Sequence, residues 1–402
     1  MHRVLLVAAV AAGLAAPSGA RAEIKTDVIR IGVLTDMSGP FATAMGPGSV
    51  TAARMAAAEF GGSVKGHRIE ILQADHQNKP DIASALARQW FDRDDVLAIA
   101  DGGTSAASLA VQELVRARSR IFLISGAGVA DLSDRACAPT AVQWTQDSNS
   151  TAKAVVVGVH ERVKGPWFFV TADYTFGHAV EADARAKLAS LGEQVAGSAK
   201  VPLNTTDFSN YLIAAQTSGA KVLALNLAAG NATAMKQAAE FAMSEQGMVV
   251  VPMSFQNVDI KAVGLQAAQG DLIVTSFFED ESPVARAWSD RFFAAQSAMP
   301  SQIQAGVYSA VRHYLQAVAD SDSDDGPTVM AKMRETEVND AYAMHGRIRA
   351  DSRMVQALRL VEVKTPAESK GPWDLVKQVG TIPVDQAFRP LNDSRCPAAQ
   401  VR

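Results

Sequence analysis

Residues 96–110 read VLAIADGGTSAASLA, and this stretch decides how the rest of the chain is interpreted. The apolar run 96–100 is typical of a central strand, and the two glycines at 102 and 103 allow the backbone to turn sharply after it. Thr104 and Ser105 then provide good N-cap residues for a helix. Backbone amides and two hydroxyls therefore converge where the helix dipole favours negative charge, which predicts a binding site for an anion such as a carboxylate. The alternative is an ordinary turn between a strand and a helix, because every α/β protein contains several.

A second junction of the same kind follows directly. Residues 121–125 form another short apolar strand, and after Gly126 the chain continues with Ala127, Gly128 and Val129. Neighbouring junctions of an α/β protein lie at the same edge of the sheet. The two junctions together can therefore hold one carboxylate.

The composition is that of a soluble globular protein. The chain has 402 residues, of which 48% are hydrophobic and 20% charged, and its formal net charge is -4. This length is sufficient for two domains. Lysine and arginine are scattered without a basic stripe, which argues against a nucleic-acid partner. The acidic run at 320–325 is interpreted as a solvated loop rather than a metal site.

The first 22 residues have the features of a secretory signal peptide. A basic start at 2–3 precedes an apolar core over 4–16, and Ala20-Arg21-Ala22 matches a cleavage pattern. The apolar core is too short for a membrane anchor, and no later segment has the roughly 20 apolar residues that a transmembrane helix needs. No cysteine lies beside the cleavage site, as a lipoprotein would require. We therefore expect a periplasmic protein that is exported by a cleaved signal peptide.

The sequence contains two cysteines, Cys137 and Cys396, and both belong to the mature chain. An exported protein with two cysteines most simply pairs them, so we predict a disulfide between these residues. The alternative is a pair of free thiols.

Strands and helices alternate twice along the chain. In the first half, strands are expected over 28–34 and 68–74, with helices over 48–60 and 80–92, before the two junctions. In the second half, helices alternate with strands over 167–171, 194–199, 221–227 and 248–252. This order predicts an α/β fold with two doubly wound lobes, each a parallel sheet with helices on both faces. The remainder is mixed, with strands expected over 271–278, 344–350, 354–363 and 373–380, and its crossings between the lobes would form a hinge.

Two loops at the carboxyl ends of strands are candidate walls of a ligand pocket. Loop 35–48 is long and apolar, and we interpret Phe41 and Met45 as pocket lining, with burial in the core as the alternative. Loop 171–177 carries Tyr174 and Phe176 at a position where doubly wound sheets bind ligands. Aromatic residues in loops are less easily explained as core residues than aromatic residues inside strands.

The patterns of metal sites and enzymes do not occur in the sequence. The seven histidines form no pair at metal-ligand spacing, and there is no HExxH or CxxC pattern. Ser125 lacks the preceding glycine of a nucleophile elbow, and neither GxGxxG nor a Walker A loop is found. The acids at 279–281 are interpreted as a solvated loop. We therefore expect no metal, no cofactor and no catalysis, which favours a binding protein.

With these features the mature chain resembles the periplasmic solute-binding proteins of ABC importers, in the branched-chain amino-acid (Leu/Ile/Val-binding) family. The resemblance covers nearly the whole mature chain and rests on IGVLTDMSGP at 31–40, GGTS at 102–105, SGAG at 125–128, TADYTFG at 171–177 and DFS at 207–209. The SKGPWD segment at 369–374 is similar to an alphaproteobacterial branch of that family.

The resemblance implies the type I periplasmic binding protein fold. One lobe is then expected from residues 23–143 and 276–348, and the other from residues 144–275 and 349–402. The implied partners are a small-molecule carboxylate and the permease and ATPase subunits of an ABC importer, and we expect a monomer.

The resemblance also implies the ligand-binding residues. In that family the ligand carboxylate meets a hydroxyl and amide at the position of Ser105 and the backbone of the second junction, and an aromatic residue falls on Phe176. The full predicted site consists of Met45, Thr104, Ser105, Ala127, Gly128, Val129, Tyr174, Phe176, Asn226 and Ser254.

Two positions depart from the amino-acid binders of that family. Those proteins hold the α-ammonium group with a threonine hydroxyl and a glutamate, where this chain has Val129 and Ser254. A buried ammonium without a partner costs on the order of several kcal/mol, so we predict a ligand without an α-ammonium, such as an aromatic or keto acid. One alternative is an amino acid, if Glu240, Glu245 or Asp259 reaches the site. The other is a sensing module that passes its bound state to a receptor.

Overall fold

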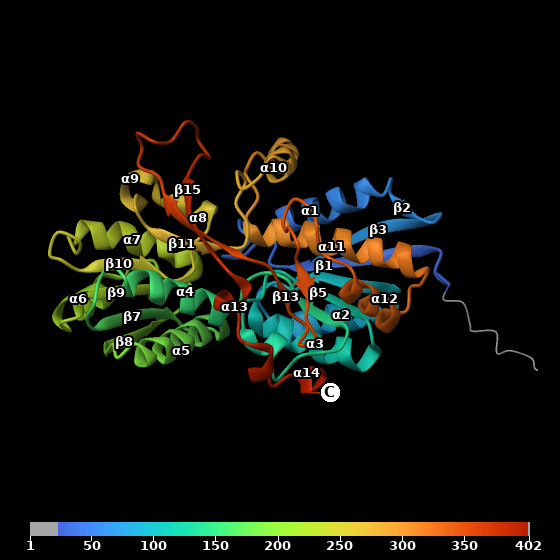
Figure 1. The fold of residues 1–402 in the computed structure, drawn as a ribbon, viewed down its shortest axis with the longest axis horizontal. Helices are drawn as coiled ribbons and strands as arrows, with labels where there is room; N and C mark the ends of the chain where they lie inside the picture. Colours follow the sequence, from blue (N-terminus) through green and yellow to red (C-terminus); the bar gives the residue numbers. More distant parts are fainter. Residues whose placement is uncertain (1–22, 401–402) are drawn as a thin grey trace, which may run out of the picture.

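The computed structural model describes residues 23–400 and shows two parallel sheets, each flanked by helices (Figure 1). This arrangement confirms the predicted α/β fold. The predicted signal peptide, residues 1–22, lies outside the described residues.

The first sheet has six strands in the order β2-β3-β1-β4-β5-β6, all parallel except the pair of β2 and β3. The strands are β1 (Val28–Thr35), β2 (Ser63–Val64), β3 (His67–Asp75), β4 (Val96–Asp101), β5 (Ile121–Ile124) and β6 (Ala141–Gln143). Every residue of β4 is buried, as expected for a central parallel strand with helices on both sides.

Helices cover both faces of the first sheet. The helices α1 (Gly46–Glu59), α10 (Pro283–Gln296), α11 (Gln302–Ser321) and α12 (Gly326–Glu335) share one apolar core with it, and α2 (Pro80–Asp92) and α3 (Ser105–Arg118) share the other. Helices α1 and α2 match the expected ranges 48–60 and 80–92 to within two residues. Their apolar faces and their flanking glycines and prolines are local signals.

The second sheet has four parallel strands in the order β10-β9-β7-β8. The strands are β7 (Trp167–Ala172), β8 (Val195–Val201), β9 (Val222–Asn226) and β10 (Val249–Pro252). One core contains α4 (Ser148–His160) and α5 (Thr175–Ser190), and the other contains α6 (Ser209–Thr217), α7 (Asn231–Glu240) and α8 (Asn257–Val263), with the short α9 (Leu265–Ala268) beside them.

The last part of the chain differs from the expected strands. The expected strand over 354–363 is two strands, β13 (Met354–Val355) and β14 (Leu358–Val363), and β14 pairs with β11 (Leu272–Thr275) and β15 (Val376–Ile382) in an antiparallel sheet. The break lies at Gln356 and Ala357, and the side-chain amide of Gln356 donates to the carbonyl of Ser276 at 3.1 Å. The expected strand over 344–350 is reduced to β12 (Arg347–Ile348).

In the described residues, the chain passes four times between the half of the molecule built on the first sheet and the half built on the second. Three of these connections join β6 to α4, β11 to α10 and β13 to β14, and the C-terminal tail is the fourth. Arg353, which is buried, lies beside two of them, with its guanidinium 3.9 Å from Asp147 and its Cζ 4.9 Å from the ring centre of Phe388. The division into two lobes and their relative movement stay predictions.

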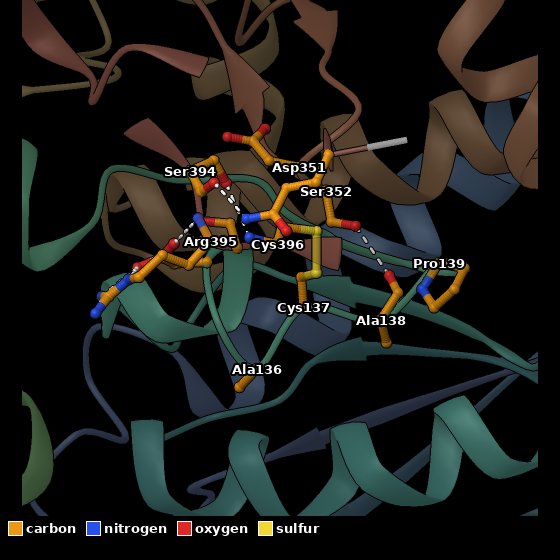
Figure 2. The surroundings of a disulfide bond; sticks show 12 residues. Ala136, Cys137, Ala138, Pro139, Asp351, Ser352, Ser394, Arg395 and Cys396 are labelled. Carbon is orange, nitrogen blue, oxygen red and sulfur yellow. Dashed lines mark hydrogen bonds and ion pairs between the residues drawn. A yellow bond between two sulfur atoms is a disulfide. The ribbon is translucent and has the colours of Figure 1, made fainter. Parts of the chain in front are cut away.

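The C-terminal tail bridges the same two halves. Its helix α13 (Val384–Ala387) packs beside α4, and the tail then reaches the loop after β5, where Cys396 forms the predicted disulfide with Cys137 (Figure 2). Asp134 of that loop accepts a hydrogen bond from the backbone amide of Arg395 at 2.6 Å and pairs with its guanidinium. The tail ends in the 3-10 turn Leu391–Asp393 and the short α14 (Pro397–Gln400).

Candidate ligand-binding site

A cavity of about 240 Å³ lies between the carboxyl ends of the strands of both parallel sheets. Its walls come from the loop before α1, from the junctions after β4, β5 and β6, from the junctions after β7, β9 and β10, and from the start of α11. Doubly wound sheets bind ligands at this edge. Seven of the ten predicted residues line the cavity: Met45, Thr104, Ser105, Gly128, Tyr174, Phe176 and Ser254.

The first junction has the backbone that its sequence predicted. Asp101, Gly102 and Gly103 all have positive φ angles, of 72°, 79° and 61°, which is why two of the three are glycines. Thr104 takes the N-cap position of α3, but its side chain caps no amide, which differs from the expectation. Its hydroxyl is buried and has no hydrogen-bond partner among the described residues, although the residue lines the cavity.

Ser105 connects the two junctions. It is the first residue of α3, and its Oγ accepts a hydrogen bond from the amide of Val129 at 3.2 Å. Ser125 also lines the cavity with a hydroxyl that has no partner in the described part of the chain, and Thr145 beside it donates to the Ser125 carbonyl at 2.7 Å. This wall is therefore rich in hydroxyl groups.

Two residues of the second junction support the cavity without lining it. The carbonyls of Ala127 and Val129 accept hydrogen bonds from the side-chain amide of Gln143 at 3.0 and 3.1 Å. Only Gly128 of the three predicted residues is exposed to the cavity. Gln143 belongs to β6, a strand that was not predicted from the sequence, so these two hydrogen bonds were not predicted either.

Aromatic side chains from both halves meet at the cavity. The ring centres of Phe41 and Tyr174 are 5.9 Å apart, and those of Tyr174 and Phe176 are 6.2 Å apart. Phe176 also lies against Gly128, where an added Cβ would be 2.4 Å from its Cε2. Met45 packs in the same cluster as Phe41, so the loop before α1 both lines the cavity and is buried.

The two remaining predicted residues have different positions. Ser254 lines the cavity, and its carbonyl accepts a hydrogen bond from the side chain of Asn231 at 2.6 Å. Asn226 is buried away from the cavity, and its side-chain amide donates to the carbonyl of Gly177 at 2.6 Å. Asn226 thereby fixes the end of β9 to the start of α5.

Helix α8, to which no site role was assigned from the sequence, supplies Asp259 and follows Gln256, and both residues line the cavity. Of the three acids that could have reached the site, Asp259 lies in it, whereas Glu240 and Glu245 are exposed elsewhere. Burial raises the pKa of Asp259 to about 7, against the opposing effect of a hydrogen bond from the Gln256 amide. The cavity therefore contains an acidic side chain, which is the arrangement that the amino-acid alternative requires.

The charges around the cavity limit what it can bind. Among the described residues, no lysine, arginine or histidine lines it, and no group of three potential metal ligands occurs. Burial also raises the pKa of Tyr174, and the charge of Asp259 adds to this effect, so the phenol stays neutral. The site offers hydroxyls, amides, aromatic surface and one carboxyl group.

Two α/β halves with a cavity between the carboxyl ends of their sheets define a binding protein for a small molecule. No helix in residues 23–400 combines the length and apolarity needed to cross a membrane. The sequence matches the family model of periplasmic binding proteins over residues 28–372. The chain belongs to this family, as a type I periplasmic binding protein, and its family binds solutes without catalysing a reaction.

Solved structures agree with this assignment. A periplasmic binding protein from Burkholderia mallei is 38% identical, with a TM-score of 0.89 over 92% of this chain and 99% of that chain. A branched-chain amino acid ABC transporter periplasmic ligand-binding protein from Burkholderia xenovorans is 36% identical, with a TM-score of 0.83 over 92% of this chain and 100% of that chain.

A solute-binding protein of an ABC transporter from Rhodopseudomonas palustris, in complex with 3,4-dihydroxybenzoic acid, shares the fold at 19% identity. Its TM-score is 0.80 over 89% of this chain and 98% of that chain. None of the curated proteins matches the chain.

Proposed function

We propose that this protein is the periplasmic capture component of an ABC importer and that its ligand is a small monocarboxylate with an aromatic or keto-acid body. The observation that carries the proposal is the pairing of a hydroxyl-rich wall with an aromatic wall in a cavity without cationic side chains. The unpaired hydroxyls of Thr104 and Ser125 would gain partners from a carboxylate, and hydrogen bonds to a charged group are among the stronger ones.

The aromatic wall fits the body of such a ligand. Phe41, Tyr174 and Phe176 present apolar ring surface, and flat ligands pack well against rings. Since Phe41 comes from one half and the other two from the second half, a ligand between them would hold the halves together. We expect the lobes to close on the ligand and to present the closed form to the permease and ATPase subunits.

An amino-acid ligand is the second candidate. It is favoured by Asp259, whose ionised form could pair with an α-ammonium, and by the branched-chain description of the Burkholderia xenovorans relative. Val129 argues against it, because this residue presents no hydroxyl and its amide is bonded to Ser105. The Rhodopseudomonas palustris complex shows that this fold can accept an aromatic acid.

A thermal-shift screen tests the ligand class. The purified mature protein is heated with about 1 mM of each aromatic acid (benzoate, 4-hydroxybenzoate, 3,4-dihydroxybenzoate), keto acid (phenylpyruvate) or amino acid (leucine, phenylalanine). A ligand at roughly 1,000 times its Kd adds about 4 kcal/mol to the free energy of unfolding, which raises the Tm by several degrees. The proposal predicts this shift for at least one acid without an amino group, and shifts by amino acids alone would contradict it.

Export and oligomeric state need separate tests. N-terminal sequencing of protein from the periplasm should begin at Glu23, because cleavage is expected after Ala22. Light scattering should give the mass of a single chain with and without ligand.

A further inference from the structure

We infer that Asp259 meets the ligand as an uncharged carboxylic acid and donates a hydrogen bond to a ligand oxygen remote from the ligand's carboxylate. This inference rests on the proposed function. It adds the ligand feature that selects among monocarboxylates, namely an oxygen outside the carboxylate, such as that of a hydroxyl or keto group.

The position of Asp259 is set by the start of α8. Its Oδ2 accepts a hydrogen bond from the backbone amide of Gln256 at 2.9 Å, which leaves Oδ1 for an occupant of the cavity. Asn257 fixes the same turn to the other half of the molecule, because its side-chain amide donates to the carbonyl of Pro300 at 2.9 Å. The carboxyl group is therefore held at the wall of the cavity.

Within residues 23–400, no cation is placed to balance an ionised Asp259. Lys261 on the same helix points to the surface, where its Nζ donates to the carbonyl of Pro372 at 2.8 Å. The charged residues of the adjacent α7, Lys236 and Glu240, are both exposed. Tyr174 is the titratable residue that faces Asp259 across the described cavity wall, and it is neutral.

The loop before α1, residues 36–45, contributes no cation either. Its buried Asp36 accepts hydrogen bonds from the amides of Gly39 and Phe41 at 2.8 and 3.0 Å. A ligand carboxylate and an ionised Asp259 would thus be two anions in one cavity, and their repulsion in a poorly hydrated space is unfavourable. Protonation of Asp259 removes the repulsion and turns the group into a hydrogen-bond donor.

Burial supports the same protonation state. Because burial raises the pKa of Asp259 to about 7, the protonated form is accessible at neutral pH before a ligand arrives. A bound anion raises this pKa further. Binding of a monocarboxylate should therefore take up a proton, whereas a zwitterionic amino acid would need the ionised form and release one.

The test is calorimetric titration of the mature protein with 4-hydroxybenzoate and phenylpyruvate between pH 6 and pH 8. With a free pKa of about 7, linkage predicts affinity that falls about tenfold from pH 6 to pH 8, with uptake of about half a proton at pH 7, measured in buffers of different ionisation enthalpy. Asp259→Asn should abolish both effects and keep the affinity within a few-fold of the wild-type value at pH 6. The exposed Glu245→Gln is the matched control and should leave both effects unchanged.

The remote hydrogen bond has its own comparison. Benzoate lacks an oxygen remote from its carboxylate and should bind to the wild type roughly three- to tenfold more weakly than 4-hydroxybenzoate. In Asp259→Leu, which cannot donate this hydrogen bond, the difference between the two ligands should be smaller. Carboxylate binding that is independent of pH and of Asp259→Asn would overturn this inference and leave the proposed function standing. Binding of amino acids alone, with affinity that rises towards pH 8 and is lost in Asp259→Asn, would overturn both.

Discussion

The ring centres of Phe41 and Tyr174 lie 5.9 Å apart, although the two residues belong to different halves of the molecule. Phe176 extends this contact to Gly128, so the aromatic residues of the second half touch both the first loop and the second junction of the first half. The cavity is therefore enclosed by contacts that exist only while the halves are close together. Ligand affinity should depend on these contacts more strongly than the stability of the ligand-free protein does.

A methyl group at Gly128 tests this dependence. In Gly128→Ala the new Cβ would lie 2.4 Å from Cε2 of Phe176, so the ring must move before the halves can approach. We expect at least a tenfold loss of ligand affinity by calorimetry, with little change in the Tm of the ligand-free protein. Combination with Phe176→Leu should restore part of the affinity by relieving the clash. A double variant that binds more weakly than either single variant would contradict this interpretation of the contact.

Ser105→Ala tests the anion site. The hydroxyl lines the cavity and accepts a hydrogen bond from the Val129 amide, so its loss should weaken carboxylate binding by about 1.5–3 kcal/mol and lower the free energy of unfolding by about 1 kcal/mol. Ser108→Ala is the matched control, because Ser108 Oγ donates to the Gly102 carbonyl at 2.8 Å and does not line the cavity. Equal losses of affinity in the two variants would show that Ser105 acts only through stability.

The sequence predicted this first junction well because its signals are local. Buried apolar residues over 96–100, two glycines with positive φ and hydroxyl residues at a helix start all lie within ten residues. Tyr174 and Phe176 line the cavity, because a loop at the carboxyl end of a strand places its aromatic side chains at the edge of the sheet, and their contact with a ligand stays a prediction.

The features that the sequence missed depend on contacts between distant segments. Helix α8 has only seven residues, too few for a clear apolar period, so the sequence named Asp259 only as one of three acids that could reach the site. Strand β6 has only three residues and was not predicted. The hydrogen bonds from Gln143 of this strand to the carbonyls of Ala127 and Val129 were therefore not predicted either. Asn226 was predicted at the site, but its side-chain amide donates to the carbonyl of Gly177 and braces the start of α5.

The disulfide between Cys137 and Cys396 should contribute strongly to stability, because it closes a loop with a sequence separation of 259 residues. Replacement of both cysteines by serine should lower the free energy of unfolding by about 2–5 kcal/mol, measured by urea denaturation. Reduction of the wild-type protein should reproduce this loss. Thiol titration of the unreduced, denatured protein should detect no free thiol, and two free thiols would show that the bond is not formed.

Small-angle X-ray scattering tests closure of the two halves. The aromatic contacts across the cavity should form more completely when a ligand is bound, so saturating 4-hydroxybenzoate should reduce the radius of gyration. In Gly128→Ala the reduction should be smaller. An unchanged radius of gyration in the wild type, at a concentration where calorimetry shows saturation, would rule out closure as the response to binding.

Ligand selectivity is tested most directly by calorimetry at pH 7 on mature protein from which bound ligand has been removed by unfolding and refolding. The central claim is that the cavity selects a monocarboxylate without an α-ammonium, because its hydroxyl-rich wall holds the carboxylate and Val129 presents no hydroxyl for an ammonium group. We predict micromolar or tighter binding of an aromatic or keto acid such as 4-hydroxybenzoate or phenylpyruvate, and at least a hundredfold weaker binding of leucine and phenylalanine. Micromolar binding of leucine, isoleucine, valine or phenylalanine, with no heat from the acids that lack an amino group, would contradict the claim.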